Sequence, residues 1–274
     1  MAYEAEISRS NPTCFLFLID QSGSMSDPVG DESGRRKADA LADALNRLLM
    51  DLCIRCTKDA REGVRDYYEI GVIGYGAQGG IVGSALGGAL SGRELVRVSE
   101  LAASPLRVEV RRDQERERRF PVWVEPVADD GTPMCAALRR AYAILNHWVA
   151  AHPRSFPPIV INITDGQPTD GDPEDEATAI RQLATQDGQV LLFNLHISET
   201  KAQPCLYPED DAYLPDDHAR LLFRMSSILP PHIVSLAQNE NLPVTYRSRG
   251  FVFNAPMTEV VRFLNIGTRP KNLR

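Results

Sequence analysis

The chain has 274 residues, a net charge of -7 at pH 7 and a pI near 5.3, which excludes nucleic-acid binding driven by bulk positive charge. Its hydrophobic fraction of 43% is enough for a sizeable core. No apolar run approaches the roughly 20 residues of a membrane span. The N-terminal stretch has no signal-peptide core and the five cysteines imply no disulfide framework, so we expect a cytoplasmic protein.

The first predicted element is a strand formed by the apolar run Phe15–Ile19. An uninterrupted run this short is typical of a parallel strand that is covered on both faces. Asp20, Ser22 and Ser24 follow at alternate positions, which point the same way in extended backbone. One carboxylate and two hydroxyls therefore converge where the strand ends, and such hard oxygens suit Mg²⁺, Ca²⁺ or Mn²⁺.

An amphipathic helix is predicted from Lys37, with apolar residues at intervals of three and four up to Cys56. Cys53 and Cys56 form a CxxC that could indicate a redox or zinc site. Both lie on the apolar stripe, and neither a second pair nor a histidine cluster accompanies them. We therefore expect buried structural thiols.

Strands are next expected at Tyr67–Tyr75 and, as a short edge strand, at Ile81–Leu86. The mixed-charge run Arg111–Arg119 is expected to be a solvated loop or edge. Thr132 and Pro133 then favour a helix start, because a hydroxyl cap precedes a proline of the first turn. This helix should run to about Ala150.

The apolar run from Pro158 ends at Asp165, which places a second carboxylate at the end of a strand. Asp170 and Asp172 are expected to be turn or cap residues of the next helix rather than ligands. The remaining predicted elements are a strand at 189–197, helices at 217–227 and 231–239, a strand at 250–253 and a helix at 257–266. Strands that alternate with helices predict a parallel sheet with helices on both faces.

The DxSxS of Asp20, Ser22 and Ser24 resembles the metal-ion-dependent adhesion site of von Willebrand factor A domains. The resemblance extends to the GTP that contains Thr132 and to the strand and TDG that contain Asp165, in the family's order. It implies that these five residues form a site for Mg²⁺, or for Mn²⁺ or Ca²⁺. Thr132 would then turn its hydroxyl toward the cation, whereas the residues alone also allow it simply to cap its helix.

The resemblance covers roughly residues 13–266 and implies a doubly wound, mostly parallel six-stranded sheet with one antiparallel edge strand. Residues 1–12 would then be an N-terminal extension and residues 267–274 a C-terminal tail. The family's function implies a non-enzymatic adaptor without catalytic residues, whose metal binds the carboxylate of a partner's Glu or Asp. No nucleic acid or membrane partner is expected.

The closing stretch from Gly250 also resembles bacterial proteins related to TerY, of the tellurium-resistance group. This second resemblance implies a stress-response or defence setting. Partners implied by it are a Ser/Thr protein kinase and a PP2C-type phosphatase, or a MoxR-type ATPase.

The alternative is a Mg²⁺-dependent phosphohydrolase or phosphotransferase that uses the aspartates at strand ends. A nucleophile loop of the haloacid-dehalogenase type needs DxD, and here position 22 is serine. A serine nucleophile needs a paired base, and no sequence motif links a histidine to Ser22 or Ser24. We therefore expect binding rather than catalysis.

Overall fold

The computed structural model describes residues 3–30, 34–57, 59, 63–113, 116–197 and 203–268. The predicted extension and tail lie partly outside these ranges, at residues 1–2 and 269–274. Among the described residues, no helix combines the length and the apolar character that crossing a membrane requires.

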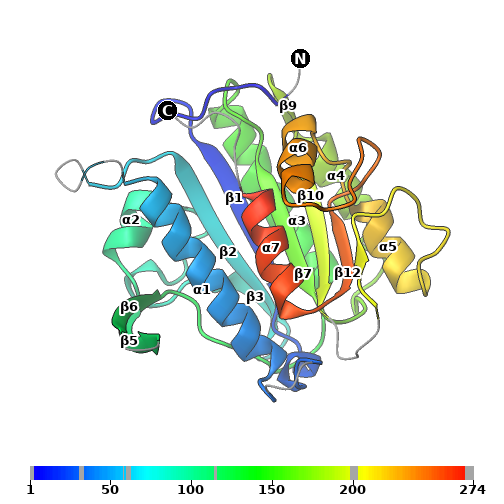
Figure 1. Cartoon of the computed structure of the whole chain (residues 1–274), viewed down its shortest axis with the longest axis horizontal. Helices are drawn as coiled ribbons and strands as arrows, with labels where there is room; N and C mark the ends of the chain where they lie inside the picture. Colours follow the sequence, from blue (N-terminus) through cyan, green and yellow to red (C-terminus); the bar gives the residue numbers. More distant parts are fainter. Residues whose placement is uncertain are drawn as a thin grey trace.

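An eight-stranded sheet forms the centre of the protein, in the order β11, β12, β10, β7, β1, β2, β3, with β4 also paired to β2 (Figure 1). The five central strands are parallel to one another, which confirms the predicted α/β class. They are β1 (Thr13–Asp20), β2 (Tyr68–Ala77), β7 (Ile159–Thr164), β10 (Leu191–Ile197) and β12 (Phe251–Ala255).

The predictions of six strands and of a single antiparallel edge are wrong. Antiparallel strands lie at both edges of the sheet: β3 (Ile81–Ser84) and β4 (Val96–Arg97) pair with β2, and β11 (Cys205–Leu206) pairs with β12. The expected edge strand near Ile81 is present. The other two were missed because two residues are too few to produce an alternating pattern.

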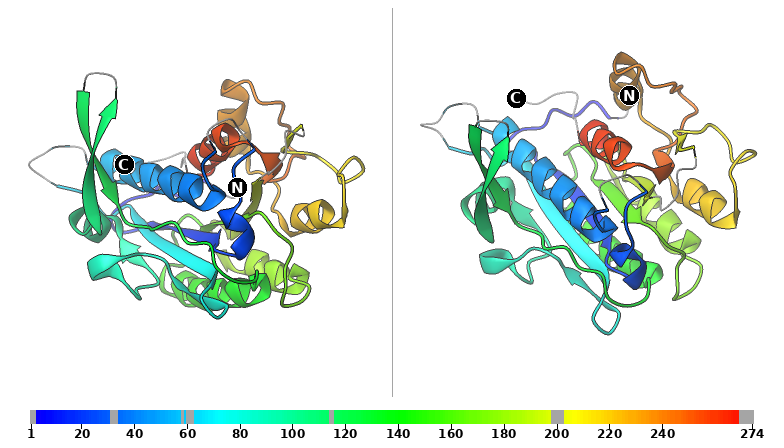
Figure 2. Two further views of the ribbon diagram at one scale, coloured as in Figure 1. Left: turned by 90° about the horizontal axis from the view of Figure 1, so that it is seen from below. Right: turned by 60° about the horizontal axis from the view of Figure 1, so that its bottom comes forward.

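Helices cover both faces of the sheet, as Figure 2 shows from two further directions. On one face lie α1 (Lys37–Arg55), α2 (Val98–Ala103), α6 (Pro231–Asn239) and α7 (Met257–Gly267). On the other face lie α3 (Met134–Ala151), α4 (Glu174–Gln182) and α5 (Asp217–Met225). Short 3-10 helices occur at η1 (Gly23–Ser26) and η2 (Gly88–Leu90), and β8 (Ala184–Thr185) pairs with β9 (Gly188–Gln189).

The apolar run in β1 divides between two hydrophobic cores. Phe15 and Phe17 belong to the core under α1 and α7, whereas Leu16 and Leu18 belong to the core under α3. All four side chains are at most 1% exposed. A strand with both faces buried has no polar side, which explains why the sequence shows no alternation here.

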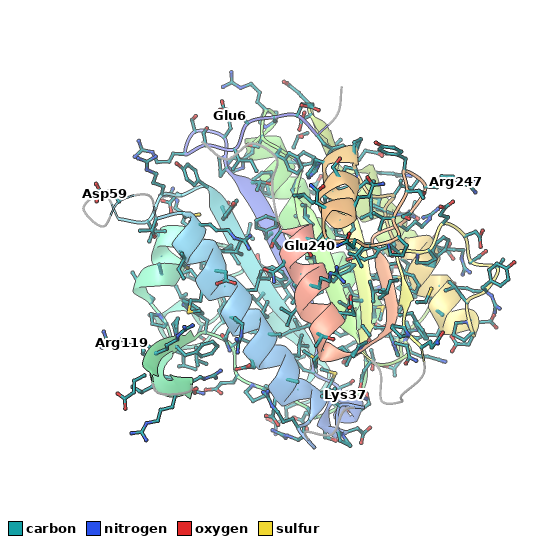
Figure 3. All side chains as sticks on the ribbon, viewed as in Figure 1. Glu6, Lys37, Asp59, Arg119, Glu240 and Arg247 are labelled. Atoms are coloured by element: carbon teal, nitrogen blue, oxygen red, sulfur yellow. The ribbon has the colours of Figure 1, made fainter. Side chains whose placement is uncertain are left out.

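The chain leaves the adjacent strands β1 and β7 toward opposite faces of the sheet. After β1 it forms α1 and returns as β2, whereas after β7 it forms α4 on the other face and returns as β10. Such a reversal of strand order opens a crevice at the carboxyl ends of the strands, where ligands of α/β proteins bind. Figure 3 marks this end of the molecule by Lys37, at the beginning of α1.

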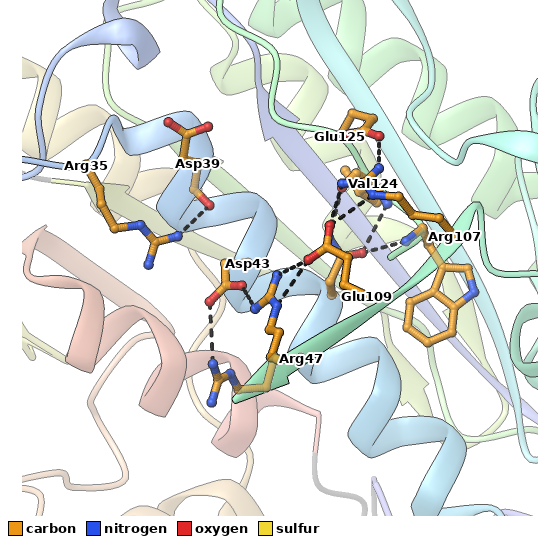
Figure 4. Close-up of polar contacts among 11 residues, drawn as sticks. Arg35, Asp39, Asp43, Arg47, Arg107, Glu109, Val124 and Glu125 are labelled. Atoms are coloured by element: carbon orange, nitrogen blue, oxygen red, sulfur yellow. Dashed lines mark hydrogen bonds and ion pairs between the residues drawn. The ribbon is translucent and has the colours of Figure 1, made fainter. Parts of the chain in front are cut away.

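A charged hairpin of β5 (Arg107–Asp113) and β6 (Arg116–Val122) stands beside α1 (Figure 2). The run predicted as a loop or edge therefore lies largely in its two strands. Ion pairs connect Asp43 with Arg47 along α1, Arg107 with Glu109 along β5, and Arg107 with Glu125 (Figure 4). The guanidinium of Arg111 lies 3.5 Å from the ring centre of Phe120 and pairs with Asp43, so it attaches the hairpin to α1.

The CxxC of α1 is buried, as expected. Cys53 is 8% exposed and Cys56 has no exposed surface. Burial raises the pKa of both thiols to about 12, so both remain protonated at neutral pH. Redox and metal chemistry both need the thiolate. The two cysteines are therefore better explained as buried structural thiols than as a redox or zinc site.

Candidate metal centre

Asp20 ends β1 and uses both carboxylate oxygens to fix the loop that follows. Its Oδ1 accepts a hydrogen bond from the backbone N–H of Ser22 at 2.9 Å, and its Oδ2 accepts one from the Thr164 hydroxyl at 2.7 Å. The residue is 1% exposed, and burial raises its pKa to about 6 against the lowering effect of these hydrogen bonds. Asp20 therefore connects the carboxyl ends of β1 and β7.

Asp165, directly after β7, is held in the same manner. Its Oδ1 accepts a hydrogen bond from the Ser24 hydroxyl at 2.7 Å, and its Oδ2 accepts one from the Lys37 ammonium at 2.7 Å. The side chains of Lys37 and Asp165 have no exposed surface. Both predicted carboxylates are thus occupied by donors of the chain itself, which leaves the hydroxyls as the available oxygens.

Ser22 and Ser24 lie next to each other, with their Oγ atoms 3.1 Å apart. Ser22 is buried and precedes η1, whereas Ser24 lies within η1 and is partly exposed. The two hydroxyls therefore meet at the end of the sheet, as the alternating spacing predicts, and Ser24 is the one that solvent reaches.

The loop that contains Thr132 is fixed to the first loop by backbone hydrogen bonds. Gly23 donates to the carbonyl of Asp130 at 2.7 Å, and Asp130 donates to that of Gly76 at 2.9 Å. A methyl group on Gly76 would lie 2.3 Å from the carbonyl oxygen of Gly131, and Gly76 has a φ of +91°. This close approach requires glycine, and it places the Thr132 loop against Ser22.

Thr132 does not cap the helix that follows it. The helix α3 begins at Met134, and Asp170 caps it by accepting from the backbone N–H groups of Cys135 at 3.0 Å and Ala136 at 2.8 Å. Asp170 is thus a cap residue rather than a ligand, but it caps α3 and not the following helix α4, for which it was expected. Thr132 is 5% exposed, and its hydroxyl makes no hydrogen bond within the described part of the chain. Of its two possible roles, capping is wrong, and the hydroxyl is available to a ligand.

Gly166 marks the space among these loops. A methyl group built on its Cα would lie 3.5 Å from Thr132 Oγ1 and 3.7 Å from Ser24 Oγ. The hydroxyls of two distant segments therefore border the space that this glycine leaves empty. The fold brings the five predicted residues together, from β1, η1, the loop before α3 and the end of β7.

The donor set suits a hard cation held through hydroxyls. Within the described residues, no three His, Cys, Asp or Glu side chains lie together in a way that could hold a metal ion. A cation here would depend on the oxygens of Ser22, Ser24 and Thr132, oriented by Asp20 and Asp165. Oxygen donors of this kind fit Mg²⁺ or Mn²⁺ and exclude a thiolate-bound zinc.

Three residues that hold the site were not predicted: Lys37, Thr164 and Thr169. Thr169 accepts from the backbone N–H of Thr132 at 3.0 Å and donates its own N–H to the Thr132 carbonyl at 2.9 Å. Lys37 precedes Leu41 and Leu45 at intervals of four, and this position on the apolar stripe could have indicated its burial. Thr164 is the threonine of the TDG that carries the resemblance, whereas no signal in the sequence distinguishes Thr169.

No family model and no curated protein sequence matches the chain. Among solved structures, it is similar to the pilus adhesin SpaC from Lactobacillus rhamnosus GG, with a TM-score of 0.50 and 16% identity. That match covers 95% of this chain and 30% of the adhesin, so the chain spans less than a third of the adhesin's length.

Two further neighbours have lower TM-scores. Manganese-loaded TRAP protein of Plasmodium vivax gives 0.44 at 16% identity, over 96% of this chain and 76% of that protein. The ArnB paralog VWA2 from Sulfolobus acidocaldarius gives 0.37 at 14% identity, over 72% and 37%. At such identities the likeness shows the fold alone, which is that of von Willebrand factor A domains.

Proposed function

We propose that the chain is a non-enzymatic adaptor that binds an acidic residue of a partner protein through a divalent cation. Ser22, Ser24 and Thr132 hold the cation, Mg²⁺ or in its place Mn²⁺ or Ca²⁺, through their hydroxyls. Asp20 and Asp165 orient these hydroxyls. The observation that carries the proposal is that both carboxylates have both oxygens occupied by donors of this chain.

The charge balance of the site favours an incoming anion. Neutral hydroxyls do not cancel the charge of a divalent ion, and Lys37 adds a positive charge 2.7 Å from Asp165. When bound, the cation supplies an open coordination position that a partner's carboxylate completes by a charge-assisted contact. Ser24 is partly exposed, so the partner can approach from solvent.

The setting of this interaction is the finer part of the proposal. The likeness of the C-terminal stretch to TerY-related proteins supports a bacterial, cytoplasmic role in stress response, tellurium resistance or defence. The partners proposed on that basis are a Ser/Thr protein kinase and a PP2C-type phosphatase, or a MoxR-type ATPase. The acidic residue that reaches the metal would belong to one of them.

The metal is tested by calorimetric titration of Mg²⁺ into wild-type protein and into Ser24→Ala and Asp172→Asn. Asp172 lies outside the five proposed residues and accepts a local hydrogen bond from the backbone of Glu174, so its variant is a control for changing a polar group elsewhere in the chain. We expect Ser24→Ala to weaken Mg²⁺ binding at least tenfold and Asp172→Asn to leave it unchanged. A titration in which the wild-type protein binds no Mg²⁺ would contradict the proposal.

The partner's carboxylate is tested on an array of candidate partner peptides, each printed with Glu or Asp and again with Gln or Asn. Binding is expected in Mg²⁺ for the acidic versions and is lost in EDTA. Equal binding of the amide versions would contradict the role of the carboxylate.

The absence of catalysis is part of the proposal. Within the described residues, the Ser22 and Ser24 hydroxyls hydrogen-bond each other, Ser24 also donates to Asp165, and no histidine contacts either hydroxyl. We therefore expect no turnover of an aryl phosphate in Mg²⁺. Activity that disappears in Asp20→Asn would instead favour a phosphohydrolase.

A further inference from the structure

A cavity opens beside the candidate metal centre, on the side of α5. Its volume is about 410 Å³, and its lining includes Asp165, His196, Asp216, His218, Phe253 and Asn254. These residues come from the carboxyl ends of β7, β10 and β12 and from the beginning of α5. Because Asp165 belongs to both places, the cavity adjoins the candidate metal centre.

His196 is held in place by the protein. Its Nδ1 accepts from the backbone N–H of Asn254 at 3.3 Å. The ring stacks on Phe253 with centres 4.2 Å apart. Asn254 adopts a φ of 60°, in the left-handed region, to make this contact. His196 therefore forms a fixed wall of the cavity.

His218 lacks such partners. It is 8% exposed, and both ring nitrogens are buried without a hydrogen-bond partner among the described residues. Two rings lie near it, with centres 5.6 Å away for His196 and 6.3 Å away for Phe253. A buried polar group without a partner costs about 1–3 kcal/mol, so a ring that lines a cavity in this state indicates a polar occupant.

The charges around the cavity determine which occupant fits. Two lining residues, Asp165 and Asp216, are acids, and no Lys or Arg lines the cavity within the described residues. Lys37 compensates Asp165, whereas Asp216 only caps α5 by accepting from the backbone of Ala219 at 2.8 Å. Burial lowers the pKa of His218, so its ring is neutral at pH 7 and keeps a nitrogen that accepts a hydrogen bond.

We propose that this cavity binds a basic side chain, lysine or arginine, which the partner carries next to the acidic residue that reaches the metal. The basic group donates to the free nitrogen of His218 and neutralises Asp216. An anion would be repelled by Asp216, and an apolar group would leave His218 without a partner. This inference rests on the proposed function, because the metal defines which partner segment lies here.

The test uses n-butylammonium as a probe, titrated in EDTA into protein with ¹⁵N- and ¹³C-labelled histidines. Butanol and propionate serve as neutral and anionic probes, and sodium chloride keeps the ionic strength constant. We expect saturable shifts of the His218 ring signals with n-butylammonium, at a dissociation constant at least tenfold lower than that of butanol. No response at His218, or an equal response to butanol or propionate, would overturn the inference.

Asp216→Asn and Asp217→Asn form a matched pair for the same titration. Asparagine also caps helices, so Asp216→Asn removes the charge and preserves the helix start. Asp217 is its neighbour, with a fully exposed side chain paired to Arg220. Asp216→Asn should raise the dissociation constant at least fivefold and Asp217→Asn less than twofold. Equal effects of the two variants would mean that surface charge alone attracts the probe, which would overturn the inference.

The outcome is independent of the metal. If the probe binds in EDTA but the protein binds no Mg²⁺, the proposed adaptor function is contradicted, and the cavity still binds organic cations. If the protein binds Mg²⁺ but His218 does not respond to the probe, the adaptor function stands, and the proposed recognition of a basic side chain is contradicted.

Discussion

The Lys37 ammonium and the Asp165 carboxylate form an ion pair with an N–O distance of 2.7 Å, and both side chains are completely buried. The pair joins the first turn of α1 to the residue that directly follows β7. Ser24 donates to the other carboxylate oxygen. The positive charge of Lys37 therefore stabilises the acid that a cation would otherwise have to compensate.

Replacing Lys37 by methionine should destabilise the protein most strongly without metal. The variant leaves Asp165 buried and uncompensated, which costs about 3–5 kcal/mol in the free energy of unfolding. Saturating Mg²⁺ should restore part of this loss, because it returns a positive charge to the same carboxylate. The measurement is urea unfolding with EDTA and with Mg²⁺.

Arg36→Gln is the control for this variant. Arg36 lies next to Lys37, and its ion pair with Asp39 is exposed and screened by solvent, so its loss should leave the free energy of unfolding nearly unchanged. A Lys37→Met protein that is equally destabilised with and without Mg²⁺ would contradict the link between Lys37 and the metal.

Gly166→Ala should reduce metal affinity without harming the fold. The added methyl group meets Thr132 Oγ1 and Ser24 Oγ at 3.5 and 3.7 Å, which is ordinary contact, but it fills the space between the hydroxyls. We expect at least a tenfold loss of Mg²⁺ affinity by calorimetry and a nearly unchanged free energy of unfolding.

Gly83→Ala is the matched control, because its methyl group would meet nothing within 4 Å in β3. It should leave both the Mg²⁺ affinity and the stability nearly unchanged. Full Mg²⁺ affinity in Gly166→Ala would mean that the cation binds elsewhere.

A buried polar chain crosses the sheet below the site. The Tyr75 hydroxyl donates to Asn162 at 2.9 Å, Asn162 donates to Asn194 at 3.0 Å, and Asn194 donates to Ser226 at 3.0 Å. Asn162→Leu removes the hydrogen-bond partner of both Tyr75 and Asn194, which should lower the free energy of unfolding by about 1–3 kcal/mol for each group. Tyr75→Phe leaves only one, so chemical denaturation should show the smaller loss for Tyr75→Phe. The reverse order would contradict this account.

The sequence was informative where a strand was long and buried. The runs that end at Asp20 and Asp165 predict buried strands of a parallel sheet, and β1 and β7 are two such strands, which the structure places side by side. The alternation of Asp20, Ser22 and Ser24 also predicts that the two hydroxyls meet. These predictions succeed because they depend on local geometry and on a rule for parallel sheets.

The sequence was less informative about contacts between distant segments. A lysine at the beginning of a helix is usually exposed, so the burial of Lys37 depends on Asp165, 128 residues later in the chain. Asp170 was expected to be a turn or cap residue, but that it caps α3 rather than α4 depends on how two loops pack. The unsatisfied ring of His218 likewise arises only when α5 meets β10 and β12.

The most direct measurement is an anomalous difference map from crystals soaked in Mn²⁺. The account predicts one strong peak about 2 Å from the hydroxyl oxygens of Ser22 and Ser24, the distance expected for a small hard cation. Soaked crystals of Gly166→Ala should lack the peak. A manganese peak at another place in the molecule, or no peak in the wild-type protein, would contradict the central claim.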